Sequence, residues 1–399
     1  MPPAPKGPLR GLLVLDVSSV ILGPMATQYL GDMGADVVKV EGPEGDVTRS
    51  IGARRSEGMG ALFMANNRNK RSVVLDLKTP AGRDALLRLA GRADVLLHSV
   101  RTDAAERIGL SWPLLSAANP RLVYCHVKGF RDDGPYGGRP AYDDIVQALS
   151  GLAMLQTVPA GGEPRYVPTI IADKVTAVHA AYAVALALFH RERTGRGQAV
   201  SLPMLETTVA FLAQEHLGGA VFEPAEGPMG YAPVREGMRR PFATRDGFLC
   251  FMPYTDGHWR RFAALIDRPD LAADPAFATM KGRQADIGRV WAEVGRQVAG
   301  RSNAEWLALL TGSDIPFAVL NRLEDLLDDP HLVATGFWQM HEHPTDGTLR
   351  LPANPIELPD SPPSIRLLPP RLGEHTAEVL AEYGFGAGEV ERLTDSERV

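Results

Sequence analysis

Cysteine is scarce in this 399-residue chain, which contains only Cys125 and Cys250. They are far apart and each lies in an apolar run, so the sequence has neither a disulfide framework nor the Cys/His spacing of a zinc site. We expect both thiols to be buried in strands. With a Pro-rich N-terminus that does not resemble a signal peptide, the scarcity of cysteine favours a cytoplasmic protein.

An excess of basic charge and a long apolar segment are also missing. The chain has 42 Lys and Arg against 48 Asp and Glu, a net charge of −6, which favours neither nucleic acid nor an anionic membrane as a partner. The longest apolar stretch, Val175–Phe189, contains polar residues and is too short to span a bilayer. An anionic ligand therefore has to be held by a local basic cluster.

Several common catalytic motifs do not occur. The loop VSSVILGPM lacks the G-x-G-x-x-G spacing of dinucleotide-binding turns, and the sequence has no P-loop, no H-E-x-x-H and no G-x-S-x-G. Conventional NAD, ATP and serine-hydrolase chemistry is therefore disfavoured. We expect no metal site and no permanently bound cofactor.

The N-terminal half alternates short β-branched runs with helical segments. Such alternation predicts an α/β fold with a doubly wound, parallel, Rossmann-like sheet covered on both faces. The expected strands lie at 12–16, 36–41, 72–77, 94–98, 122–127 and 199–202.

The length predicts two domains. We expect residues 1–215 to form the first part of a large Rossmann-like α/β domain, because the composition becomes Gly- and Pro-rich after that point. Residues 216–245 read as a linker, and 246–315 as a smaller α+β domain. Residues 316–399 are expected to return to the large domain and to end in a helix near 373–383.

Two segments are candidates for binding or chemistry. The stretch 67–78 carries Arg68, Lys70, Arg71 and Lys78, which could meet phosphates or could be an ordinary solvated loop. Asp173 begins a long apolar helix predicted over 173–191. There it is either a helix cap or a carboxylate that the helix N-terminus keeps ionised for nucleophilic attack.

The order of several motifs resembles the class III CoA-transferase family of the CaiB/BaiF type, which includes formyl-CoA and carnitine CoA-transferases and, as a relative, alpha-methylacyl-CoA racemase. The resemblance covers nearly the whole chain. It is carried by LDVSSVILGPMATQYLGDMGADVVKVEGPEGDVTR, NKRSVVLDLKTPAGR, RIGLSW, PAYDDIVQALSG, the ADK turn, RTGRGQ, DDPHLVATGFW and LGEHT.

The resemblance implies roles for particular residues. Asp173 takes the place of the nucleophilic aspartate, and Tyr142 lies beside the acyl site. The loop near the thioester falls on Val20, Ile21 and Leu22, whereas Lys70 and Arg71 become structural. The residues that grip the CoA nucleotide fall on Leu75, Lys78, Ser99, Arg101, Arg107 and Ile108.

The sequence departs from the formyl-CoA transferase pattern in ways that disfavour oxalate and formate. A first-loop glutamine is replaced by Ile21, and an arginine after VVKVE by Gly42. The racemase histidine falls on Tyr142, whose phenol, with a pKa near 10, is a poor base. His126 lies away from the matching motif, and we expect His179 to be a core residue.

The resemblance implies transfer of CoA from an acyl-CoA to a carboxylic acid through an acyl-aspartyl anhydride and an aspartyl-CoA thioester. CoA and acyl-CoA are then substrates, and the chain forms an interlocked homodimer. Arg49, Arg239 and Arg240 are candidates to pair a distal carboxylate, as in a succinyl group, or are ordinary surface or interface residues. A racemase or isomerase acting at Cα and a non-catalytic acyl-CoA binder are the alternatives.

Overall fold

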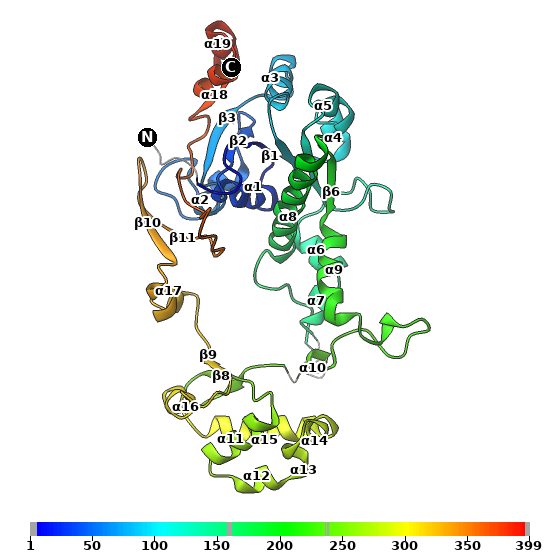
Figure 1. Ribbon diagram of the computed structural model, residues 1–399, viewed down its shortest axis with the longest axis vertical. Coiled ribbons are helices and arrows are strands. Elements are labelled where there is room, and N and C mark those ends of the chain that lie inside the picture. The colour runs from blue at the N-terminus through cyan, green and yellow to red at the C-terminus, as the bar shows by residue number, and fades with distance from the viewer. Residues whose placement is uncertain (1–5, 158–161, 236, 238, 396–399) are drawn as a thin grey trace. The chain divides into compact units, whose positions relative to one another are not determined.

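The computed structural model describes residues 6–157, 162–235, 237 and 239–395 (Figure 1). The chain divides by its internal contacts into two units. The larger contains Met1–Ala153, Arg165–Gln214 and Val333–Val399, and the smaller contains Met154–Pro164 and Glu215–Leu332. The smaller unit is therefore inserted twice into the chain of the larger one.

A six-stranded sheet forms the centre of the larger unit. All neighbouring strands are parallel, in the order β3-β2-β1-β4-β5-β6. The predicted parallel α/β sheet is thus confirmed, and its order is that of a doubly wound nucleotide-binding fold. The strands are β1 (Leu13–Val17), β2 (Asp36–Glu41), β3 (Lys70–Val74), β4 (Val95–His98), β5 (Val123–Lys128) and β6 (Ala199–Pro203).

Helices cover both faces of this sheet, as buried parallel strands require. One apolar cluster joins the sheet to α3 (Pro80–Ala90), α4 (Thr102–Arg107), α5 (Trp112–Ala118) and the C-terminal α18 (Thr376–Glu382). The other joins it to α1 (Leu22–Asp32), α6 (Asp143–Leu149), α8 (Ile171–Thr194) and α9 (Met204–His216). The remaining elements of the larger unit and its borders are η1 (Val47–Ser50), α2 (Ala61–Asn66), α7 (Leu152–Leu155), α17 (Pro330–Ala334), β10 (Trp338–His343), β11 (Gly347–Pro352) and α19 (Ala387–Asp395).

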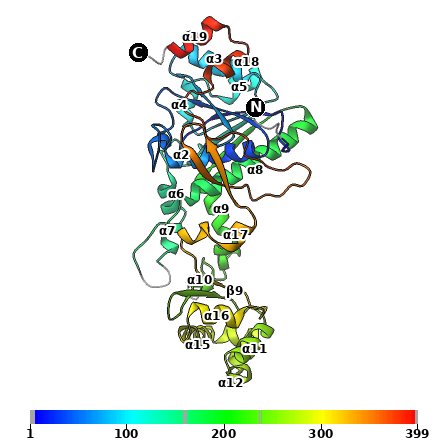
Figure 2. The same cartoon turned by 90° about the vertical axis from the view of Figure 1, so that its left-hand side faces the viewer.

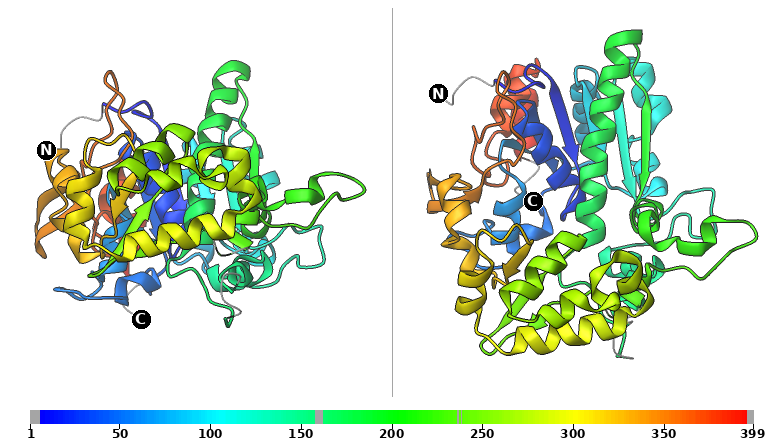
Figure 3. Two further views of the ribbon diagram at one scale, coloured as in Figure 1. Left: turned by 90° about the horizontal axis from the view of Figure 1, so that it is seen from below. Right: turned by 60° about the horizontal axis from the view of Figure 1, so that its bottom comes forward.

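Helix α8 lies against the sheet along its length (Figure 3). It is the one helix among the described residues that is long and apolar enough to cross a membrane. Its small residues Ala177, Ala180 and Ala187 are buried in the sheet's apolar cluster, which makes it a core helix. It ends at Gly195, whose φ of 75° is the left-handed conformation that glycine supplies at a helix C-terminus.

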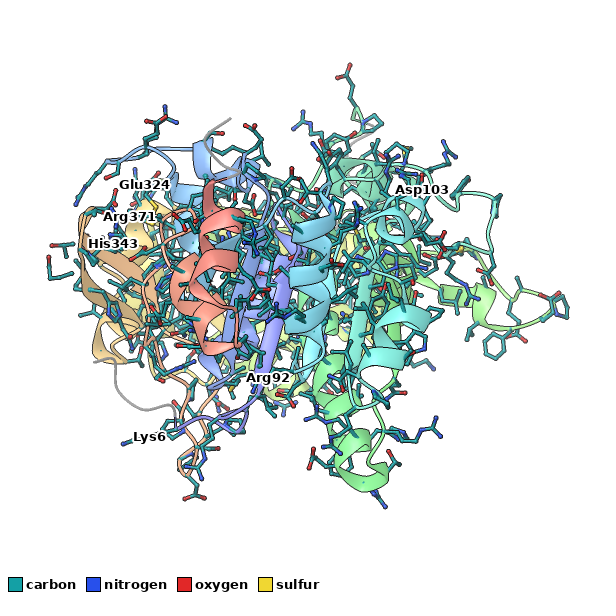
Figure 4. All side chains as sticks on the ribbon, turned by 90° about the horizontal axis from the view of Figure 1, so that it is seen from above. Lys6, Arg92, Asp103, Glu324, His343 and Arg371 are labelled. Atoms are coloured by element: carbon teal, nitrogen blue, oxygen red, sulfur yellow. The ribbon has the colours of Figure 1, made fainter. Side chains whose placement is uncertain are left out.

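The C-terminal segment protects the exposed edge of the sheet at β3 (Figure 4). The His375 backbone N–H donates to the Ser72 carbonyl at 2.9 Å, and the Val74 N–H donates to the Thr376 hydroxyl at 3.1 Å. These contacts occupy backbone groups that an edge strand otherwise presents to other chains. Arg71 adds an ion pair to Glu382 on α18.

The β10–β11 hairpin packs on the loop before α2 (Figure 2). Asp346 in its turn accepts from the Ser56 N–H at 3.0 Å, and the Asp346 carbonyl accepts from Arg55 at 2.5 Å. At the end of β10, His343 Nε2 lies 3.0 Å from the Pro369 carbonyl oxygen. The return segment is therefore an integral part of the larger unit.

The smaller unit has an antiparallel sheet in the order β7-β8-β9 beside a group of short helices. An aromatic core that includes Phe251, Trp259, Phe262 and Trp306 holds it together. Its elements are η2 (Gly218–Val221), α10 (Ala232–Arg235), β7 (Phe242–Ala243), β8 (Phe248–Phe251), α11 (Asp256–Leu265), α12 (Pro269–Ala273), α13 (Pro275–Ala278), α14 (Met280–Ala285), α15 (Ile287–Ala299), α16 (Asn303–Leu310), β9 (Phe317–Val319) and η3 (Glu324–Leu327).

The fold differs from the sequence-based expectation at several points. Strand β3 begins two residues and ends three residues earlier than expected. The segment 316–320, expected to begin the return, belongs to the smaller unit because β9 pairs with β8. A second C-terminal helix, α19, follows α18. Cys250 is exposed, since alternate residues of β8 face outwards, whereas Cys125 is buried as expected and its thiol pKa is raised to about 12 by burial.

Two fully buried lysines lie among the first three strands. Lys70 donates to Asp16 at 2.9 Å and to Asn67 at 2.8 Å, and Lys39 donates to Asp46 at 3.0 Å. Burial acts to raise the pKa of Asp16, but the two lysine charges prevail and lower it to about 2. Lys70 is thus structural, as the resemblance implied.

We expect Lys70→Met to destabilise the protein by about 3–5 kcal/mol, because it leaves the Asp16 carboxylate buried without its closest cation. Chemical denaturation measures this change. The double variant Asp16→Asn/Lys70→Met should recover part of the loss, and Arg131→Ala, which removes the exposed pair with Asp133, should leave the midpoint unchanged. A loss no larger than that of Arg131→Ala contradicts the prediction.

Candidate active site

A cavity of about 220 Å³ opens at the carboxyl ends of β1, β2 and β4. From β1 the strand order extends through β2 to β3 at one edge of the sheet. After β3 the chain crosses back to β4 on the other side of β1, so the topological switch point lies between β1 and β4. Ligands of doubly wound folds bind in the crevice at this point. Its lining includes Ser18, Ser19, Asp46, Leu77, Ser99 and Val100.

One of the residues that the resemblance assigned to the CoA nucleotide lines this cavity, and two more are next in sequence to its lining residues. Ser99 lines it directly. Lys78 follows the lining residue Leu77, and Arg101 follows the lining residue Val100, and both cations are exposed. Each cation is thus next in sequence to a residue of the cavity wall, which makes it a candidate to meet phosphates.

The other predicted nucleotide contacts lie further from the opening. Leu75 is buried in the apolar cluster under the cavity, and Ile108 packs against the same cluster. Arg107 ends α4 and lies 3.5 Å from Asp103 on the preceding turn. Both side chains are well exposed, so this pair leaves Arg107 accessible to an anion.

The first loop leads from the cavity to helix α1. Val20 has a φ of 72°. Ile21 occupies the N-cap position of α1, and Leu22 is the first residue of the helix. Gly23 is required by close packing, because a Cβ there would lie 2.1 Å from the Ser18 hydroxyl oxygen. No side chain caps α1, so the N–H groups of its first turn are available to an anion.

Asp173 lies within the first turn of α8, which begins at Ile171. Its side chain is 9% exposed, and the N-terminal cap position is Ile170. Helices α1 and α8 pack against each other on one face of the sheet. Since each helix joins two parallel strands, both begin at the carboxyl edge, and Asp173 therefore shares this edge with the first loop.

A second carboxylate, Asp143, caps helix α8. One of its oxygens accepts from the Ala172 N–H at 2.6 Å and from the Asp173 N–H at 3.2 Å. The interpretation of Asp173 as the cap is therefore wrong. These two N–H groups are also occupied, which removes them as donors to an oxyanion.

The pKa of Asp173 is raised to about 7, first by burial and then by the negative charge of Asp143. The expectation that the helix N-terminus keeps this carboxylate ionised is thus corrected, because Asp143 already uses the favourable N–H groups. A carboxyl group that titrates near neutral pH in a mostly dry site has the properties of a catalytic group.

Gln147 connects Asp143 to the segment before α8. Its side-chain amide donates to Asp143 at 2.7 Å, and its carbonyl oxygen accepts from the Val167 N–H at 2.9 Å. Tyr142, which precedes Asp143, is 70% exposed at the start of α6. Asp143 and Gln147 were not found from the sequence, although an Asp directly after Tyr142 and a Gln four residues later form a recognisable i, i+4 pair.

The arginines considered for a substrate carboxylate have different environments. Arg49 is buried and binds Glu41 through two bonds of 2.8 and 2.7 Å, with its guanidinium 3.7 Å from the centre of the Phe63 ring. Its guanidinium is thereby committed to the fold. Arg239 and Arg240 are exposed in the smaller unit.

The remaining predictions concern histidines and metals. His179 is exposed, which corrects its expected place in the core, and its Nδ1 lies 2.8 Å from the Val175 carbonyl. His126 contacts the Val100 carbonyl at 2.9 Å, and its pKa is lowered by burial. Within the described ranges, no three His, Cys, Asp or Glu residues are grouped so that they could hold a metal ion.

Comparison with known proteins identifies relatives over nearly the full length. The model of CoA-transferase family III matches residues 9–376. A succinate–glutarate CoA-transferase of Agrobacterium fabrum is 35% identical, covering 95% of this chain and 96% of the relative. A succinyl-CoA:mesaconate CoA-transferase of Haloarcula hispanica is 34% identical over 96% of this chain and 98% of the relative.

Solved structures agree with this similarity. Rv3272 from Mycobacterium tuberculosis superimposes with a TM-score of 0.82 at 30% identity, covering 94% of this chain and 99% of that one. A CAIB/BAIF family protein from Brucella suis gives 0.81 at 31% identity, covering 95% and 100%. The fold is therefore shared with proteins of clearly related sequence.

If Asp173 must lose a proton to react, kcat/KM should rise with pH and reach half of its plateau near pH 7. Asp143→Asn should move this midpoint to lower pH, because the like charge is removed while an oxygen remains to accept from α8. Burial remains, so the midpoint should stay above the ordinary aspartate value. Initial rates across pH 4–9 measure the shift.

Asp144→Asn is the matched control, since Asp144 carries the same charge on the first turn of α6 but is exposed. Its midpoint should equal that of the unmodified protein. An unchanged or higher midpoint in Asp143→Asn argues against a charge effect on Asp173.

Proposed function

The chain belongs to CoA-transferase family III, and we propose that this class III CoA-transferase works through Asp173 as a covalent nucleophile. The observation that carries the proposal is a buried carboxyl group with a pKa of about 7 at the carboxyl edge of the sheet, where the ligand cavity also lies. Ionised Asp173 is poorly solvated and therefore reactive.

The proposed reaction is a double displacement. The Asp173 carboxylate attacks the thioester carbonyl, the C–S bond breaks, and CoA thiolate and an acyl-aspartyl anhydride result. The thiolate attacks the aspartyl carbonyl, which releases the donor acid and leaves an aspartyl-CoA thioester. The acceptor carboxylate then displaces the thiolate to form a second anhydride, and the thiolate attacks its acyl carbonyl to give the new acyl-CoA and free Asp173.

Coenzyme A is a substrate in this scheme, and no other cofactor takes part. We assign its nucleotide to the cavity with Ser99 in its wall and with Lys78 and Arg101 next in sequence to its lining residues. The uncapped first turn of α1, at Leu22 and Gly23, is the proposed donor to the thioester oxyanion. One such donor contributes about 3–4 kcal/mol to transition-state stabilisation in other enzymes.

We propose a dicarboxylic acyl group such as succinyl as the donor. The support is the similarity to transferases whose names specify succinate with glutarate and succinyl-CoA with mesaconate. Because Arg49 is bound to Glu41, we do not assign it to the distal carboxylate.

We further propose that the chain acts in the cytoplasm as a homodimer, interlocked as the resemblance implies. Its two cysteines are free, in keeping with a reducing compartment. Helix α8 exposes large apolar side chains at Val178, Tyr182, Leu186 and Phe189. Their spacing places them along one side of the helix, opposite the side that packs on the sheet, and such a stripe is typical of a protein interface.

Incubation with succinyl-CoA and glutarate should produce glutaryl-CoA, and hydroxylamine should trap a hydroxamate on Asp173. Asp173→Ala should lower kcat more than a thousandfold and should abolish the modification, because the proposed mechanism forms the anhydride on Asp173. Peptide mass spectrometry and chromatography of the CoA esters make the two measurements. Near-normal transfer by a folded Asp173→Ala variant contradicts the mechanism, and solvent deuterium entry at Cα without an acceptor acid indicates an isomerase.

Light scattering should give twice the 43.1 kDa mass of the chain. Tyr182→Asp/Phe189→Asp should lower that mass or cause aggregation, since the charges would be buried at the interface. Leu114→Asp on α5, at an exposed position on the other face of the sheet, is the control and should remain dimeric. A monomeric unmodified protein rules out the proposed assembly.

A further inference from the structure

Val20 has a backbone conformation that β-branched residues rarely adopt. Its φ of 72° is in the left-handed region, where the Cβ of a β-branched side chain meets the backbone. Such strain persists only where surrounding contacts impose it, and it is concentrated at functional sites. Val20 lies between the cavity-lining Ser19 and the first turn of α1.

The backbone N–H of Val20 is bonded to Asp46. Its two carboxylate oxygens lie 3.3 and 3.2 Å from the Val20 nitrogen, whose N–H donates to them. Asp46 is itself fixed, because its own N–H donates to Glu41 at 3.0 Å and Thr48 donates to it through N–H and hydroxyl.

Lys39, within β2, contacts both Asp46 and the first loop. Its fully buried ammonium donates to Asp46 at 3.0 Å and to the Ser18 carbonyl at 2.9 Å, so it holds both Asp46 and the loop. Burial acts to raise the pKa of Asp46, but the Lys39 charge and the Thr48 bonds prevail and lower it. The pair is therefore ionised.

A simpler role for Asp46 is to cap the short η1 helix through Thr48. That role accounts for the Thr48 bonds only. It leaves unexplained why both oxygens also face the Val20 N–H and why a buried lysine is committed to the same carboxylate and to Ser18. These additional contacts all converge on the first loop.

We propose that Asp46, held by Lys39, is a positioning residue for the transfer reaction that fixes Val20 in the left-handed conformation and thereby aims the first-turn N–H groups of α1 at the thioester. This inference rests on the proposed function. Asp46 acts through the loop, and the reacting atoms meet the N–H groups that follow Val20. Gly23 allows those groups to lie close to Ser18, because a Cβ at this position would be 2.1 Å from the Ser18 hydroxyl oxygen.

A double-mutant cycle tests the proposal with Asp46→Ala and Val20→Gly. Asp46→Ala should lower kcat for succinyl-CoA-dependent transfer at least tenfold. Glycine adopts positive φ without a Cβ clash, so Asp46→Ala should cost at least threefold less when Val20→Gly is also present. All rates are compared at a temperature where circular dichroism shows native structure, and Asp46→Asn replaces Asp46→Ala in the cycle if the alanine variant does not fold.

Hydrogen exchange gives a readout that does not depend on turnover. The Val20 amide should exchange at least tenfold faster in Asp46→Ala than in the unmodified protein. Thr48→Val is the control, because it removes one bond to Asp46 and leaves those between Asp46 and Val20; its exchange and kcat should stay within twofold of the unmodified protein.

An equal loss of kcat with and without Val20→Gly overturns the proposal, because it shows a general structural role for Asp46. Unchanged protection of the Val20 amide in Asp46→Ala also overturns it. If the unmodified protein transfers no CoA, the proposed function fails and with it the role in catalysis, whereas the exchange measurement still decides whether Asp46 holds the loop.

Discussion

Two fully buried lysines, Lys39 and Lys70, constrain how β1, β2, β3 and the first loop fit together. A charge in an apolar interior is costly unless it is paired, so each lysine requires a carboxylate at a fixed place. Lys70 thereby joins β3 to β1 through Asp16, and Lys39 joins β2 to the first loop through Asp46 and Ser18. The loop, the start of α1 and one wall of the cavity depend on these pairs.

Asp173, the proposed nucleophile, is subject to a second electrostatic constraint. Asp143 stabilises α8 by accepting from its first N–H groups, but its charge also opposes ionisation of Asp173. One carboxylate therefore orders the helix that carries the reactive group and moves its pKa towards neutrality. Structural order and reactivity come from the same interaction at this position.

The strands that carry β-branched runs could be predicted from the sequence, since burial on both faces leaves a strong local pattern. DVVKVE forms β2 with the expected bounds, β4 and β6 differ from theirs by one residue at one end, and β1 and β5 are displaced by one residue. The prediction was poorer for β3, which was expected at 72–77 and lies at Lys70–Val74. Asp173 could be singled out only through the resemblance, because alone it looked like a helix cap. Its actual cap, Asp143, lies thirty positions earlier and reaches α8 through the folding of the chain.

Other features also depend on contacts that local patterns do not encode. The ion pair between Arg49 and Glu41 could not be predicted from the sequence, in which the two residues are eight positions apart. The exposure of His179 and Cys250 depends on which side of an element faces the core. The pairing of β9 with β8 joins segments separated by the helices of the smaller unit, so the border near 316 could not be placed correctly.

The C-terminal cover of β3 determines when the larger unit can be completed on the ribosome. The Gly373 N–H donates to the Ser72 hydroxyl, 301 positions away. The Val74 N–H donates to the Thr376 hydroxyl, 302 positions away. At a translation rate of about 5–20 residues per second, roughly 15–60 seconds separate the synthesis of the strand from that of its cover. During this interval β3 has no C-terminal cover, and its unpaired backbone groups are open to pairing with another chain.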